Sequence, residues 1–233
     1  MMFRIPVGRA AVFFALFAAA FSAAAGQLGF TDAERTGWEA FLRAAKIKEA
    51  VQMGGPAATT SPWKLTLSDG NVTRSGLWKD VNRGPAEGGP DLWRYDAAAY
   101  EMDVLLGLGM VPPTVERTYL GRYGSLQLWI EDVERLADRM ARGPDSLSVG
   151  AEEWDRKAFL QRVFDSLIAN DDRNLNNILI GSGDRMMILI DHSRAFHTEE
   201  PYVKTLLYGA AGARRTGDGS PYPFSRLPRL FVE

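Results

Sequence analysis

The chain of 233 residues contains no cysteine and only two histidines, His192 and His197. The absence of cysteine excludes disulfides, thiol nucleophiles and thiolate metal sites. The scarcity of histidine excludes an H-E-x-x-H zinc protease. An excess of positive charge is also missing, because 27 basic and 29 acidic side chains give a net charge of −2, which argues against nucleic acid as a partner. The 46% of hydrophobic residues instead indicates a globular protein with a buried core.

The first 25 residues have the three-part layout of a secretory signal peptide. Arg4 and Arg9 supply positive charge, an apolar run follows over 10–21, and Ala23–Ala25 offers small residues for cleavage. The apolar run is shorter than the roughly 20 residues that span a bilayer. We therefore expect an exported protein, whether periplasmic, secreted or in a secretory lumen. Membrane anchoring, the alternative, would come only through an uncleaved N-terminal segment.

The rest of the chain alternates between helical and strand-like patterns, which predicts an α+β fold. Thr31 and Glu34 form a capping-box pattern at the start of a helix over 31–46. Apolar periodicity predicts two further helices, near 95–106 and 159–168. Alternating residues and turn signals predict strands over 47–53, 63–67, 72–81, 114–120, 125–130, 178–180 and 186–190.

The helix predicted near 95–106 has two distinct faces. One face is apolar and includes Leu105 and Leu106 at its end, and the other carries Asp96, Tyr100 and Asp103 at positions i, i+4 and i+7. These patterns divide the chain into a signal peptide (1–25), a helical extension (26–46), a β-rich N-terminal lobe with one helix (47–130), a linker (131–150) and a C-terminal lobe (151–233).

A polar loop over 170–177 comes directly before an apolar strand, and the following hairpin ends on Asp191. Three interpretations are open: a solvated Asn-rich turn, a calcium loop, or part of a phosphoryl-transfer site. The calcium pattern is poor, because Asn177 and Gly183 occupy the positions where glycine and a bidentate glutamate are needed. Phosphoryl transfer requires a lysine on the phosphates, an acid to orient it, a carboxylate for the acceptor hydroxyl, and metal-binding side chains.

All these groups occur in the order that protein-kinase-like folds use: Lys79, Asp96, Asp172, Asn177 and Asp191. The D-R-N-x-x-N-I segment over 172–178 resembles the D-R-H-x-x-N-I loop of lipid kinases, and I-D-H-S over 190–193 resembles their I-D-F-G segment. Residues 96–114 resemble the E-x-x-A-[YF]-x-x-D-x-x-L-G and V-P-P-T segments of lipid and secretory kinases. The chain thus resembles the atypical kinase-like families: phosphatidylinositol kinases, HipA-type toxin kinases and secretory-pathway casein kinases.

This resemblance implies a two-lobed protein-kinase-like fold with a shortened C-terminal lobe, because only 42 residues follow Asp191. It implies ATP as the nucleotide and Mg²⁺ or Mn²⁺ as the metal. Lys79 would bind the α- and β-phosphates and pair with Asp96. Asp172 would act at the acceptor hydroxyl, and Asn177 and Asp191 would hold the metal. An ordinary exposed lysine is the alternative for position 79.

Further nucleotide contacts are implied at the predicted turn over 54–61 and in the strand over 125–131 that would lead to the adenine-contacting hinge. Gly54, Gly55 and Thr59 would cover the phosphates, although an ordinary hairpin turn also explains this sequence. Trp129 would contact the adenine, and is otherwise a core residue. His192 stands where the family has phenylalanine, as a polar substitute or as an acid/base group.

The expected function is ATP-dependent transfer of the γ-phosphate to a hydroxyl of an exported protein, a small molecule or a lipid. Two alternatives of other classes are a catalytically inactive kinase-like binding module and a structural envelope domain.

Overall fold

The structure is a computed structural model that describes residues 30–54, 60–84, 90–142, 151–170, 172–181 and 187–196. The predicted signal peptide, Gly55, Thr59, residues 143–150 of the predicted linker and the tail after Phe196 lie outside these residues. Within the described ranges, no helix is long and apolar enough to cross a membrane.

The predicted α+β class is confirmed. The larger sheet has five antiparallel strands in the order β1-β2-β3-β7-β6. Helix α3 (Trp93–Leu106) and the short pair β4 (Asn82–Arg83) and β5 (Asp91–Leu92) lie between β3 and β6 in the chain. The strands of the sheet are β1 (Lys46–Gln52), β2 (Trp63–Ser68), β3 (Thr73–Lys79), β6 (Thr114–Tyr119) and β7 (Arg122–Leu128).

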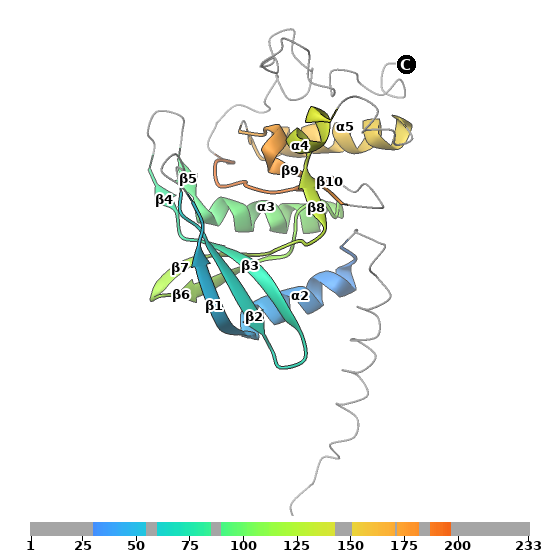
Figure 1. The fold of residues 1–233 in the computed structure, drawn as a ribbon. Helices are drawn as coiled ribbons and strands as arrows, with labels where there is room; N and C mark the ends of the chain where they lie inside the picture. The colour runs from blue at the N-terminus through green and yellow to red at the C-terminus, as the bar shows by residue number, and fades with distance from the viewer. Residues whose placement is uncertain are drawn as a thin grey trace, which may run out of the picture.

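Helix α2 (Asp32–Ala44) covers one face of this sheet, and α3 lies on the other side (Figure 1). The predicted capping box is confirmed: the Thr31 side chain accepts from the Glu34 N–H, and the Glu34 carboxylate accepts from the Thr31 N–H. Phe41 and Leu42 of α2 pack on apolar side chains of the sheet, Trp78 among them. Because strand residues alternate between faces, Lys79 points away from this core.

Gly124 fixes the path of β7 past the end of β3. A Cβ atom at this position would lie 2.3 Å from the Lys79 carbonyl oxygen and 2.7 Å from the Trp78 ring. Only glycine allows so close an approach, and the pairing of Lys79 with Ser125 holds the end of β3 in place.

A second core lies beyond α3, where a three-stranded sheet in the order β10-β9-β8 packs with the C-terminal helices. Its elements are β8 (Val133–Arg135), α4 (Leu136–Ala141), α5 (Ala151–Leu167), the 3₁₀ turn η2 (Leu175–Asn177), β9 (Ile178–Gly181) and β10 (Met187–Leu189). Figure 1 shows α3 between the two sheets. Strand β8 and helix α4 fall within the predicted linker 131–150, and β8 pairs with β9, so this part of the segment belongs to the second sheet.

Helix α3 buries its polar face and exposes the end of its apolar one. Asp96, Tyr100 and Asp103 are buried, whereas Leu105 and Leu106 are 78% and 44% exposed. The prediction that the apolar face of this helix is the buried one is therefore wrong at the C-terminal end of the helix. The reason is ion pairing, because Asp103 binds Arg35 of α2 at 2.6 Å and accepts the N–H groups of residues 110 and 111.

Candidate functional site

A lysine between two carboxylates joins the two parts of the fold. The Lys79 ammonium at the end of β3 lies 3.2 Å from Asp96 Oδ2 on α3 and 2.8 Å from Asp191 Oδ1, which follows β10. Asp96 Oδ1 also accepts the backbone N–H of His192 at 2.8 Å. Three residues that the sequence placed in one site are thus in direct contact. We call Lys79, Asp96 and Asp191 the Lys79 cluster.

The Lys79 cluster holds one cation against two acids. Burial alone would lower the pKa of Lys79, but Asp191 and Asp96 outweigh it and raise that pKa above its usual value. Attraction to Lys79 lowers the pKa of Asp191 to about 2. Burial raises the pKa of Asp96, although Lys79 opposes this. At neutral pH Lys79 is therefore an ammonium and Asp191 a carboxylate, and the two form an ion pair.

Exposure differs within the Lys79 cluster. The side chain of Lys79 is 11% exposed, that of Asp96 is 3% exposed, and that of Asp191 is 44% exposed. Asp191 also has φ +60°, in the left-handed region that aspartate tolerates better than most residues. The carboxylate that faces solvent is thus the one that a ligand can reach.

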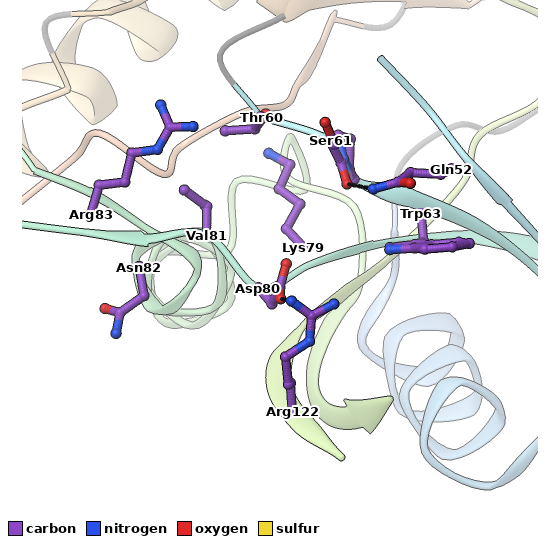
Figure 2. A pocket seen from close by; sticks show the side chains of 11 residues that line it. Gln52, Thr60, Ser61, Trp63, Lys79, Asp80, Val81, Asn82, Arg83 and Arg122 are labelled. Carbon is purple, nitrogen blue, oxygen red and sulfur yellow. Dashed lines mark hydrogen bonds and ion pairs between the residues drawn. The ribbon is translucent and has the colours of Figure 1, made fainter. Parts of the chain in front are cut away.

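Lys79 also lines a cavity of about 360 Å³ beside the β1–β2 hairpin. Figure 2 shows its side chain directed toward Thr60, with Arg83 reaching in from another side. Arg122 lines the same cavity and pairs with Asp80. The lining holds three basic side chains and one acidic one, and Lys79 and Arg122 are both paired with carboxylates.

The polar loop after α5 is tied to the strand that ends at Asp191. The Ile190 N–H donates to the Asn177 carbonyl at 3.1 Å. The side-chain amides of Asn174 and Asn177 donate to the Asp172 carbonyl at 3.1 and 3.3 Å. The carboxylate of Asp172 is about one-third exposed and lies 3.5 Å from Arg194. The predicted acceptor-binding and metal-binding residues of this loop thus share one hydrogen-bonded unit.

The chemistry of Asn177 and Asp191 fits a hard divalent cation. The Asn177 amide nitrogen is used internally, which leaves its side-chain oxygen as the ligand atom, and Asp191 contributes a carboxylate. Mg²⁺ is commonly held by one or two such oxygens together with substrate phosphates and water. Among the described residues, no group of three or more His, Asp or Glu side chains is arranged to hold a metal by itself.

The remaining predicted nucleotide contacts have mixed positions. Trp129 lies just after β7, and its backbone N–H donates to the Ser75 carbonyl at 3.0 Å. The Lys64 ammonium lies 4.0 Å from the centre of the Trp129 ring, in a cation–π contact. Gly54 follows β1 with φ +131° at the start of the β1–β2 connection. Gly55 and Thr59 lie outside the described residues.

Sequence reasoning missed Asp165 and gave no role to Arg173, although both lie at the centre of a buried network. Arg173 binds both carboxylate oxygens of Asp165, at 2.9 and 3.0 Å. Asp165 also accepts the side-chain amides of Gln161 and Asn170. The only signal in the sequence is a carboxylate beside Phe164, within the apolar stripe of α5.

No known protein-family model matches the chain. Protein Rv2133c of Mycobacterium tuberculosis is 27% identical to it over 162 residues, which covers 55% of this chain and 58% of that protein. The chain thus spans less than two-thirds of this relative. A similarity of this extent does not define the family of the chain.

Proposed function

We propose that the chain is an ATP-dependent phosphotransferase with a two-lobed, protein-kinase-like fold. One observation carries the proposal: Lys79 is shared between an ion cluster with Asp96 and Asp191 and a cavity that Arg83 and Arg122 also line. Phosphoryl transfer needs this combination, because a cation must hold the phosphates next to carboxylates that bind metal.

The order of elements supports the same fold. The lysine ends the third strand of the large sheet, the helix that follows supplies its acidic partner, and the loop with Asp172 and Asn177 precedes the hairpin that ends at Asp191. This is the order that the sequence resemblance implies. The smaller sheet with α4 and α5 would form the C-terminal lobe.

The proposed roles follow from position and charge. Lys79 would leave its contact with Asp191 and bind the α- and β-phosphates while it keeps Asp96. Asn177 and Asp191 would hold Mg²⁺ or Mn²⁺, which neutralises charge on the phosphates when it is bound. Gly54 and the hairpin turn would cover the phosphates, and Trp129 would lie against the adenine.

Asp172 would orient the acceptor hydroxyl and take its proton. The hydroxyl oxygen forms a bond to the γ-phosphorus, the bond from that phosphorus to the β–γ bridging oxygen breaks, and its electron pair stays on ADP. The acceptor is a hydroxyl of an exported protein, a small molecule or a lipid. An N-terminal signal peptide would bring the enzyme to such acceptors outside the cytosol.

The test measures γ-phosphate transfer to protein and ATP hydrolysis by the full chain with Mg²⁺ or Mn²⁺. Lys79→Met, Asp172→Asn and Asp191→Asn should each lower turnover by at least about 10²-fold, the scale of a lost catalytic group. Lys48→Met, at an exposed position of β1, is the matched control and should leave turnover unchanged.

Thermal shift with ATP and Mn²⁺ separates the alternatives, because a ligand that binds only the folded state raises the melting temperature. A shift without turnover would indicate a catalytically inactive kinase-like binding module. Neither shift nor turnover would favour a structural envelope domain. Turnover that none of the three site variants lowers would place catalysis elsewhere.

A further inference from the structure

Arg173 has no role in the chemistry proposed above, although it directly follows Asp172. Its side chain is 3% exposed and that of its partner Asp165 is 0% exposed. A guanidinium is desolvated at this depth only at a large cost, which its contacts must offset. The distribution of those contacts therefore indicates what the residue does.

All five N–H donors of Arg173 have an acceptor. Nε and one Nη2 hydrogen bind the two Asp165 oxygens. The Nη1 group donates to the carbonyls of Asn177 and Ile190, each at 2.7 Å. The other Nη2 hydrogen meets His192 Nε2 at 2.7 Å. A guanidinium has five donors and no acceptor, so its hydrogen-bonding capacity is fully used.

These acceptors come from three separate pieces of chain. Asp165 belongs to α5, Asn177 ends η2, and Ile190 and His192 lie on either side of Asp191. Both Nη1 bonds reach the backbone, one at Asn177 itself and the other directly before Asp191. The guanidinium plane therefore reinforces the direct bond from the Ile190 N–H to the Asn177 carbonyl, and it ties both backbone segments to α5.

We propose that Arg173 is a positioning residue that sets the spacing of Asn177 and Asp191 and so assembles the divalent-metal site. The proposal rests on the proposed function, because those two residues are metal ligands only in that reading. Because all donors of Arg173 are used by protein acceptors, it would bind neither the metal nor the nucleotide. It acts through the backbone of one ligand and through the neighbours of the other.

A lysine at this position cannot replace the fork. Lysine offers three donors from a single nitrogen, so it cannot bind Asp165 at two oxygens and also hold both carbonyls. Arg173→Lys keeps the charge and much of the aliphatic stem, and it removes the planar bridge. Because groups that orient metal ligands typically contribute 10–100-fold to metal affinity, the effect of this variant should appear in metal dependence.

The experiment compares ATP binding to the full chain in EDTA and in Mn²⁺, by calorimetry. In the native chain Mn²⁺ should tighten ATP binding. In Arg173→Lys this tightening should shrink by about 10–100-fold, whereas the Kd for ATP in EDTA should stay within about twofold. Arg135→Lys is the matched control, because Arg135 binds Asp138 with the same two-pronged geometry on the surface. This control should leave both Kd values unchanged.

Each outcome decides between the proposals. If the native chain binds ATP but Arg173→Lys keeps the full Mn²⁺ effect, or loses ATP binding equally in EDTA and Mn²⁺, the positioning role is wrong, while the nucleotide site of the proposed function is not contradicted. If the native chain binds no ATP under either condition, the proposed function fails and this inference with it. If Arg173→Lys does not fold, Asp165→Glu shifts the fork while keeping both charges, and the same outcomes apply to it.

Discussion

Two ion clusters lie next to each other in this fold, and both are built around one cation. In the Lys79 cluster the cation faces two carboxylates, and Asp191 is 44% exposed. In the Arg173 cluster, formed by Arg173, Asp165 and the acceptors described above, the cation faces one carboxylate and both side chains are almost fully buried. His192 connects them, since its backbone N–H donates to the Asp96 carboxylate and its ring Nε2 accepts from Arg173.

This difference indicates that the Arg173 cluster stabilises the fold, whereas the Lys79 cluster is open to a ligand. In the Arg173 cluster the charges balance and every donor of the cation is used, so the cluster has nothing left to offer a ligand. The Lys79 cluster has two acids for one cation and an open side at Asp191, where a divalent cation would bind. Removing a partner should therefore lower the stability of the fold in the Arg173 cluster and weaken ligand binding in the Lys79 cluster.

The largest effect is expected for Asp165→Leu. This change leaves the Arg173 guanidinium buried without its counter-charge, and breaking a buried pair in this way costs roughly 3–5 kcal/mol of unfolding free energy. Urea denaturation followed by circular dichroism measures it. Arg173→Met added to Asp165→Leu removes the unpaired charge and should recover part of the loss. A cost under about 1 kcal/mol for the single variant would mean that Asp165 is no support.

The two clusters also differ in how far the sequence predicts them. The order of motifs places Lys79, Asp96 and Asp191 in one site, and the structure brings the lysine into contact with both acids. Asp165 could not be predicted in this way, since the sequence does not distinguish a buried, paired aspartate on an apolar helix from a solvent-exposed one until the partner is known. The partner lies eight residues later in a loop, and its orientation depends on tertiary packing.

The same limit explains where the fold departs from expectation. The capping box at Thr31 and the hairpins were predictable because a few neighbouring residues determine them. The apolar face of α3 was wrong at Leu105 and Leu106 because hydrophobic periodicity ignores pairing, and Asp103 is buried by Arg35 from a different helix. Strand β8 is three residues long, which is too short for an alternating pattern of apolar and polar residues to be recognised in the sequence. It is defined by its pairing with β9.

The second prediction concerns the residue that joins the clusters. Burial, then the charges of Arg173 and Lys79, hold the pKa of His192 well below 6.5, and the nearby Asp191 opposes this only weakly. Below pH 6.5 the unfolded chain therefore gains a proton that the folded chain does not bind, so stability should fall with acid by at most about 1.4 kcal/mol per pH unit. In His192→Gln this contribution should vanish.

Nitrogen NMR tests the same prediction directly. His197→Gln leaves His192 as the only histidine, so its ring signals need no assignment. Because the Arg173 guanidinium can only donate, Nε2 must be the unprotonated nitrogen and Nδ1 must carry the proton. The signals should stay constant from pH 8 to 5. A titration near pH 6.5 would show that His192 is open to solvent and that the two clusters are not joined through it.

The smallest change in stability is expected for Asp191→Asn, the open end of the Lys79 cluster. Asparagine keeps an oxygen for Lys79 and adopts the left-handed backbone readily, and Lys79 keeps Asp96. Because nearly half of the Asp191 side chain is exposed, solvent screening limits the loss to less than about 1 kcal/mol.

Asp138→Asn, in an exposed pair with Arg135, is the matched control. Urea denaturation should give similar midpoints for both variants, while only Asp191→Asn loses the Mn²⁺ effect on ATP binding. A stability loss as large as that of Asp165→Leu would make Asp191 a support, and the contrast between the clusters would collapse.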